Sequence, residues 1–203
     1  MTQFLQPGLK PSFHLLGHSA FAIKSPTTRP FPSTVQAPTG DLNMMHETWT
    51  GGCQCGAVRY RLLRRPNNPC ICHCRMCQKQ FGSFFGAFAG VSAEHFVLSR
   101  GTIAYFRSSS EAERGFCRDC GTPLVYRFRS QPRIDVSIGS LDRHTEMKPE
   151  FQYGLESREP WLTEILSLPG TVTGEGDNGV GDTPERFAQI QNSNRQHPDH
   201  DTL

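Results

Sequence analysis

The chain has 203 residues, which is room for one full domain with tails or for two small domains, and its formal net charge is +2. That mild charge, without a block of lysine and arginine, argues against a nucleic-acid partner, and the lack of an apolar run of about 20 residues argues against a membrane span. The N-terminus also lacks the features of a secretory signal, so we expect a soluble, cytoplasmic protein whose eight cysteines stay reduced.

Residues 1–46 are rich in proline, serine, threonine and glycine, and this composition predicts a disordered extension. A mitochondrial transit peptide would also contain few acidic residues, but Lys10, Lys24 and Arg29 are few charges for one, so a cytoplasmic location is favoured. A start at Met44 or Met45 is a third interpretation, in which the extension is not part of the protein.

Residues 47–168 differ from both ends of the chain, because short segments of strand-forming residues alternate with glycine. Long stripes of apolar residues at helical spacing are missing, so we predict a single, mainly β domain. Pro123 is expected at a strand start or edge, where its missing N–H breaks no ladder. The predicted strands are 57–63, 82–91, 102–106, 122–128 and 133–138.

After Leu168 the sequence again becomes poor in apolar residues, and we predict that 169–203 is a disordered tail. The alternative for part of it is a short helix around 184–190.

All eight cysteines lie between Cys53 and Cys120, grouped as C-x-C, then C-x-C-x-C-x-x-C, then C-x-x-C. Zinc binds sulfur at about 2.3 Å in tetrahedral geometry, which puts neighbouring sulfurs about 3.8 Å apart. Ligands close in sequence on tight turns reach that spacing readily. In a chain without a secretion signal the spacing predicts metal sites rather than disulfides.

The cysteines divide naturally into a closed and an open set. Two flanking pairs supply the four ligands of a structural site, Cys53, Cys55, Cys117 and Cys120. The middle group supplies three ligands and an open position, Cys72, Cys74 and Cys77, with Cys70 left over. In the alternative, Cys70 is the fourth ligand and both sites are closed. His73 is a weaker ligand candidate, because its side chain points away from its neighbours' if the segment is extended.

Three thiolates on Zn²⁺ leave a net charge of −1 and one exchangeable position. A thiol that coordinates the metal there loses its proton, so the open set suits thiol chemistry. Arg75 and Lys79 would offset the charge or attract an anionic ligand; the alternative for both is a solvated face.

Four stretches resemble, in order and spacing, the glutathione-dependent formaldehyde-activating family, which shares its domain with centromere protein V. They are TGGCQCGAVRY (50–60), CHCRMCQK (72–79), RGFCRDCGTPL (114–124) and ESREPW (156–161). The resemblance implies an Mss4-like zinc-binding β-sandwich-type fold and two zinc ions per chain. It assigns Cys53, Cys55, Cys117 and Cys120 to the structural zinc and Cys72, Cys74 and Cys77 to the catalytic one.

The resemblance also implies carbon–sulfur lyase activity on a small-molecule thiol and an aldehyde, as in the addition of glutathione to formaldehyde. The alternative is a non-catalytic binding module like centromere protein V. Two features depart from the family pattern: Cys70 is extra, and Gln152 stands where many members carry histidine. The sequence predicts neither the exact substrate nor the oligomeric state.

Several other residues have a structural and a functional interpretation. Packing in the core is favoured over lining a ligand pocket for four aromatic residues, Phe81, Phe84, Phe85 and Phe88. Trp161 is expected to anchor the last segment of the domain, and Asp135 and Asp142 to stabilise loops rather than to take part in a site.

Overall fold

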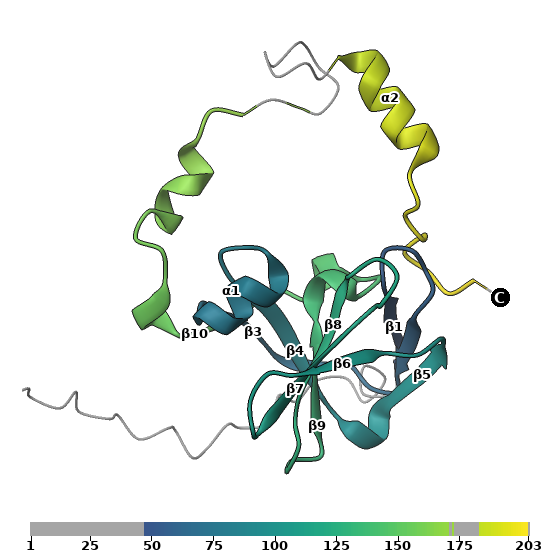
Figure 1. Cartoon of the computed structure of the whole chain (residues 1–203), viewed down its shortest axis with the longest axis vertical. Helices are drawn as coiled ribbons and strands as arrows, with labels where there is room; N and C mark the ends of the chain where they lie inside the picture. The colour runs from purple at the N-terminus through teal and green to yellow at the C-terminus, as the bar shows by residue number, and fades with distance from the viewer. Residues whose placement is uncertain (1–46, 171, 173–182, 203) are drawn as a thin grey trace, which may run out of the picture. The chain divides into compact units, whose positions relative to one another are not determined.

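The computed structural model describes residues 47–170, 172 and 183–202, and over these residues it confirms the mainly β architecture. Ten strands in this part of the chain form two sheets, and the helices are short (Figure 1). The predicted extension, 1–46, lies outside the described residues. None of the described helices has the length and apolar character needed to cross a membrane.

The smaller sheet has three antiparallel strands in the order β1-β2-β5, namely β1 Trp49–Gly52, β2 Arg59–Leu62 and β5 Phe96–Arg100. Alternation places Tyr60 and Leu62 of β2 on the buried face, while Arg61 between them is exposed. Because successive side chains point to opposite faces, this sheet covers the core with one side only.

The larger sheet has seven strands in the order β10-β3-β4-β9-β8-β7-β6. All neighbours are antiparallel except β10, which pairs parallel with β3 and so brings the chain after residue 150 back beside the middle cysteines (Figure 1). The strands are β3 Asn67–Cys72, β4 Gly86–Ser92, β6 Ala104–Arg107, β7 Ala112–Phe116, β8 Pro123–Phe128, β9 Arg133–Ser137 and β10 Phe151–Tyr153.

One hydrophobic cluster joins the two sheets. Trp49, Tyr60 and Leu62 from the small sheet belong to the same buried cluster as Leu124 and Val136 from the large one. Cys53 and Cys117 are also part of this cluster, so the first and last cysteine pairs sit at the border of the core.

Each predicted strand overlaps an observed one: β2, β4, β6, β8 and β9. Pro123 begins β8, as expected for a residue without a backbone N–H. The sequence did not predict the helix α1 Arg75–Phe81, which begins immediately after Cys74 and ends at Gly82 in the left-handed conformation.

Part of the predicted tail, 169–203, is described. It contains the helix α2 Pro184–Ser193, at the place of the alternative helix, with Thr183 accepting a hydrogen bond from the Arg186 backbone N–H at 3.3 Å. Further on, the Asp201 carboxylate pairs with Arg59 at 3.1 Å and Arg61 at 2.8 Å. The last described residues therefore contact the small sheet through ion pairs.

Candidate metal centres

The flanking cysteine pairs meet in space. We call Cys53, Cys55, Cys117 and Cys120 cluster A, because their four sulfur atoms all lie within 4.8 Å of one another. The Sγ atoms of Cys53 and Cys55 are 3.6 Å apart, and those of Cys55 and Cys117 are 3.9 Å apart. These separations match the value of about 3.8 Å expected for tetrahedral zinc, so the sulfurs fit a closed metal site.

Two glycine-containing turns bring the sulfurs of cluster A together. Gly56 and Gly121 have φ angles of +76° and +77°, which residues with a Cβ rarely adopt. The Gly56 N–H donates to the Cys53 carbonyl at 3.1 Å, and the Gly121 N–H donates to the Cys117 carbonyl at 2.9 Å. Each turn folds its pair of cysteines onto one point, as metal-binding knuckles require.

Thr122 links the two turns of cluster A. Its hydroxyl accepts the Gln54 backbone N–H at 3.0 Å and lies 3.1 Å from the Cys120 sulfur. When Cys120 is a thiolate it has no proton to give, so the hydroxyl is the donor of this contact. Burial alone would raise the pKa of Cys120, but the hydrogen bonds from Thr122 and neighbouring backbone lower it to about 6. This environment stabilises a thiolate, the form that binds metal.

The middle cysteines form a second group. We call Cys72, Cys74 and Cys77 cluster B, and their sulfur atoms also lie within 4.8 Å of one another. Cys72 ends β3, Cys74 is the residue preceding α1, and Cys77 lies in the first turn of that helix. The change from strand to helix over six residues turns the three side chains toward a common point, and the donor set fits a soft metal with one position left open.

Cys70 and His73 lie outside cluster B among the residues that the structure describes. Cys70 sits in the middle of β3, paired with Phe88 of β4 and Phe151 of β10. His73 is fully buried, and its Nε2 lies 3.0 Å from the Gln152 Oε1. Gln152, one of the two departures from the pattern of the family that the sequence resembles, therefore contacts His73.

A buried arginine contacts cluster B, although no sequence pattern predicted a role for it. The Arg114 side chain comes from β7, is only 5% exposed, and places its two Nη atoms 3.7 and 3.6 Å from the Cys77 sulfur. Nη1 also donates to the Gln80 Oε1, and the guanidinium stacks over the Tyr126 ring at 5.0 Å. The signal that could have identified it is its position: in β7 it shares the inward side with buried Ala112.

The pKa values of Cys72 and Cys70 are shifted in opposite directions from the ordinary value of a thiol. The hydrogen bond from Cys77 lowers the pKa of Cys72 to about 5, assisted by the Cys74 backbone and the charge of Arg114. Burial, with the negative charge of Asp135, raises the pKa of Cys70 to about 11. At neutral pH without metal, Cys72 is a thiolate and Cys70 a thiol.

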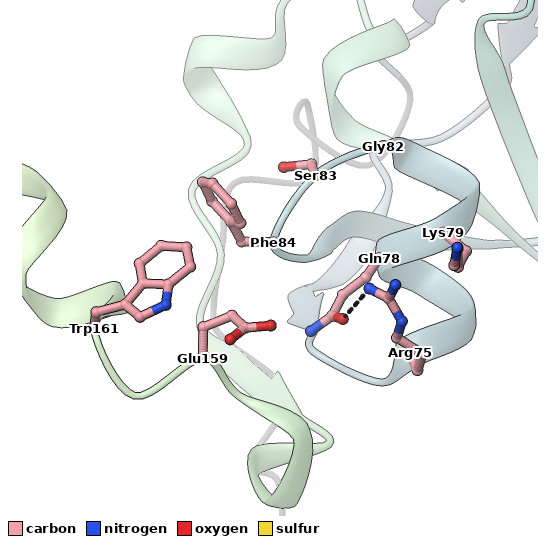
Figure 2. A pocket seen from close by; sticks show the side chains of 8 residues that line it. All are labelled: Arg75, Gln78, Lys79, Gly82, Ser83, Phe84, Glu159 and Trp161. Atoms are coloured by element: carbon pink, nitrogen blue, oxygen red, sulfur yellow. Dashed lines mark hydrogen bonds between the residues drawn. The ribbon is translucent and has the colours of Figure 1, made fainter.

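Two pockets flank α1. The first, which we call the aromatic pocket, has a volume of about 360 Å³ (Figure 2). Figure 2 shows Phe84 and Trp161 on one side and Arg75 and Lys79 projecting from the helix on the other, with Glu159 between them. Arg75 is held by a 3.1 Å hydrogen bond from its Nη1 to the Gln78 Oε1. The second pocket, of about 580 Å³, lies between α1 and the strands β6 to β8.

The other candidates from the sequence divide between core and surface. Phe88 is buried as expected, whereas Phe84 is exposed and packs edge-on against Trp161 with ring centroids 4.7 Å apart. Asp142 is buried in a structural ion pair with Arg59 at 2.5 Å, and Asp135 pairs with Arg133 at 2.8 Å. Both carboxylates therefore have structural partners.

Comparisons with known proteins agree with the cysteine pattern. A family model for glutathione-dependent formaldehyde-activating enzyme matches residues 48–157. An uncharacterized lyase of Schizosaccharomyces pombe is 33% identical over 81 residues, which cover 39% of this chain and 58% of that protein. The ureidoglycolate lyase of Burkholderia cepacia is 33% identical over 78 residues, covering 38% of this chain and 43% of that protein. The chain thus spans about half the length of the curated relatives it matches.

A solved crystal structure of a Rhodobacter sphaeroides protein also matches, with a TM-score of 0.42 and 24% sequence identity. The match covers 52% of this chain and 99% of that protein.

Proposed function

We propose that this chain, which belongs to the glutathione-dependent formaldehyde-activating enzyme family, catalyses a zinc-dependent reaction of the carbon–sulfur lyase type. The reactants are a thiol and a small aldehyde. In the forward direction the thiol S–H adds across the aldehyde C=O, forming one C–S bond and one hydroxyl group; the reverse reaction breaks the same C–S bond. The lyase names of two relatives support this class of reaction.

The observation that carries the proposal is the incomplete ligand set of cluster B. Three sulfurs that meet with no fourth protein ligand among the described residues fit the donor set of a catalytic site, whereas the four sulfurs of cluster A fit a structural one. We therefore assign one zinc to cluster A and one to cluster B. Zinc held by Cys72, Cys74 and Cys77 would supply a fourth coordination position at which a substrate thiol binds and loses its proton.

The protein's own contribution is to hold the sulfurs and balance their charge. Arg114 donates to the Cys77 sulfur and brings a positive charge to a site with a net charge of −1 when occupied. The His73 backbone N–H donates to the Tyr153 carbonyl at 2.9 Å, which fixes the segment between Cys72 and Cys74 against β10.

Two exposed cations on α1 also favour an anionic substrate. Arg75 and Lys79 are one helical turn apart beside cluster B, and each lines both pockets. A thiol that carries carboxylates, such as glutathione, is attracted to this face of the helix.

The test is exchange between a thiol and its aldehyde adduct, followed by NMR with and without the zinc-loaded protein. Glutathione with formaldehyde is the first pair, followed by other thiols and aldehydes, and ureidoglycolate cleavage is measured separately because one relative is named for it. Acceleration of a thiol–aldehyde exchange supports the proposal. No acceleration with any pair would favour the non-catalytic binding module.

Two cysteine variants form a matched pair for this assay. Cys74→Ser removes a ligand of cluster B and should abolish acceleration, while Cys70→Ser changes a cysteine outside the cluster and should leave it unchanged. Loss of activity in both variants would contradict the assignment of the open site. The cytoplasmic location stays a prediction.

A further inference from the structure

The second pocket beside α1 combines apolar walls with positive charge, and we call it the cationic pocket. Its apolar side chains are Met76 from α1, Phe106 from β6, Phe116 from β7 and Pro123 from β8. Met76 is 55% exposed and Phe106 63%, so two large apolar side chains remain open to solvent at the same cavity. A group of exposed apolar residues around a hollow is typical of a ligand site.

The charged groups of the cationic pocket all have the same sign. Arg75, Lys79 and Arg114 contribute to its lining, and no carboxylate does among the described residues. Arg114 is buried, and its Nε has no hydrogen-bond partner among them. A pocket with cations and no acidic residue favours an anion, whereas in the aromatic pocket Glu159 offsets part of the charge of Arg75 and Lys79 and weakens this preference.

The cationic pocket is physically joined to cluster B. Arg114 lines the pocket and contacts the Cys77 sulfur, and the turn that carries Cys77 also presents Arg75 and Met76 to the pocket. No cysteine of cluster B lines the pocket, but a molecule in it lies against Arg114 and the first turn of α1, which are next to the open metal site. Its volume of about 580 Å³ is within the usual range of small-molecule sites.

We propose that the cationic pocket binds the non-reacting end of the substrate, and that this end is an apolar group carrying a carboxylate. That the ligand is the substrate rests on the reaction proposed above, whereas the preference of the pocket for an apolar carboxylate rests on its lining residues. The apolar body packs between Met76 and Phe106, and the carboxylate faces the cations. The preferred thiol or adduct is then more apolar than glutathione.

The inference is tested with 3-phenylpropanoate, which has neither a thiol nor an aldehyde and so reports binding alone. Titration of the zinc-loaded full chain, followed by NMR, should show saturable binding that shifts the signals of Met76, Phe106 and Phe116. The neutral 3-phenylpropanamide should bind about tenfold more weakly, because it keeps the apolar body and loses the charge. S-methylglutathione, charged but without an apolar body, should also bind more weakly.

Two exposed aromatic residues provide matched variants. Phe106→Ala should weaken 3-phenylpropanoate binding about tenfold, since Phe106 lines the cationic pocket and not the aromatic one. Trp161 lines the aromatic pocket and not the cationic one, so Trp161→Ala should leave binding unchanged. Any one of four results would overturn the inference: equal binding of the carboxylate and the amide, equal effects of the two variants, tighter binding of S-methylglutathione than of 3-phenylpropanoate, or no saturable binding. Thiol–aldehyde exchange without probe binding would refute the pocket and leave the reaction standing, and probe binding without any exchange would do the reverse.

Discussion

Replacing Arg114 with methionine should weaken zinc binding at cluster B and leave cluster A unchanged. Methionine keeps an apolar chain of similar length but removes the charge and the N–H donors. The nearer Nη is 3.6 Å from the Cys77 sulfur and the side chain is buried, so solvent screens the interaction little. A pair of full unit charges at about 4 Å contributes about 4 kcal/mol at an effective dielectric constant of 20.

The real effect is smaller than that figure, because the thiolate charge is shared with the metal. Removing a group that supports a metal ligand typically weakens metal binding about 10- to 100-fold, and we expect Arg114→Met to fall in this range. Competition with a coloured zinc chelator measures it: of the two zinc equivalents proposed above, one should leave at about 10- to 100-fold lower chelator concentration. Arg114→Lys keeps the charge without the planar fork and should recover part of the affinity.

The control is Arg127→Met on the neighbouring strand β8, where the arginine pairs with Glu113 at 2.9 Å away from cluster B. It should release both zinc ions as the unchanged protein does. The reasoning is refuted if Arg114→Met binds two zinc ions as tightly as before. It is refuted equally if both sites weaken together, because that result would show a general loss of folding.

Three further predictions follow from the same contacts. Cys117→Ser should unfold the domain, because cluster A joins distant segments and the free energy of metal binding there contributes to folding. Cys74→Ser should stay folded and bind one zinc. Circular dichroism and metal analysis measure both, and unfolding of Cys74→Ser would show a structural role for cluster B. Asp142→Asn should reduce the free energy of unfolding by up to about 3 kcal/mol, because the buried Arg59 charge loses its closest carboxylate and keeps only the more exposed Asp201. Denaturant titration measures this, and a change no larger than that of Asp135→Asn, at a more exposed pair, would contradict it. In protein stripped of zinc at cluster B, iodoacetamide at pH 7 should label Cys72 before Cys70, because the pKa of Cys72, about 5, lies below that pH. Cys70 should react only as the pH approaches its pKa of about 11. Mass spectrometry of digests across a pH series measures the order of labelling, and the opposite order would contradict the prediction.

The approach of cysteines within each group could be predicted from the sequence, because C-x-C and C-x-x-C spacings fix local turns that hardly depend on the rest of the fold, whereas the meeting of the two pairs of cluster A depends on the fold. The strands around Tyr60 and Val136 were also predictable, since alternation and glycine boundaries are local signals. The same sequence patterns did not predict α1, because it has only seven residues and shows no apolar stripe.

The remaining features depend on contacts between distant residues. β10 has three residues and is stabilised by its parallel pairing with β3, so no local sequence pattern predicts it. The contact between His73 and Gln152 follows from that pairing. Arg114 contacts cluster B only because β7 and α1 meet, and a single charged residue in a strand does not indicate its partner.

The two clusters differ in how far apart along the chain their ligands lie. Cluster B is contained in six consecutive residues, whereas the contact between Cys55 and Cys117 in cluster A closes a separation of 62 residues. During synthesis, all three ligands of cluster B are present soon after Cys77 leaves the ribosome. Cluster A is complete only after Cys117 and Cys120 have been synthesised. Loop closure adds an entropy penalty that local ligands avoid. Under the assignment proposed above, all three ligands of the open site are therefore in place before the last two ligands of the structural site have been synthesised.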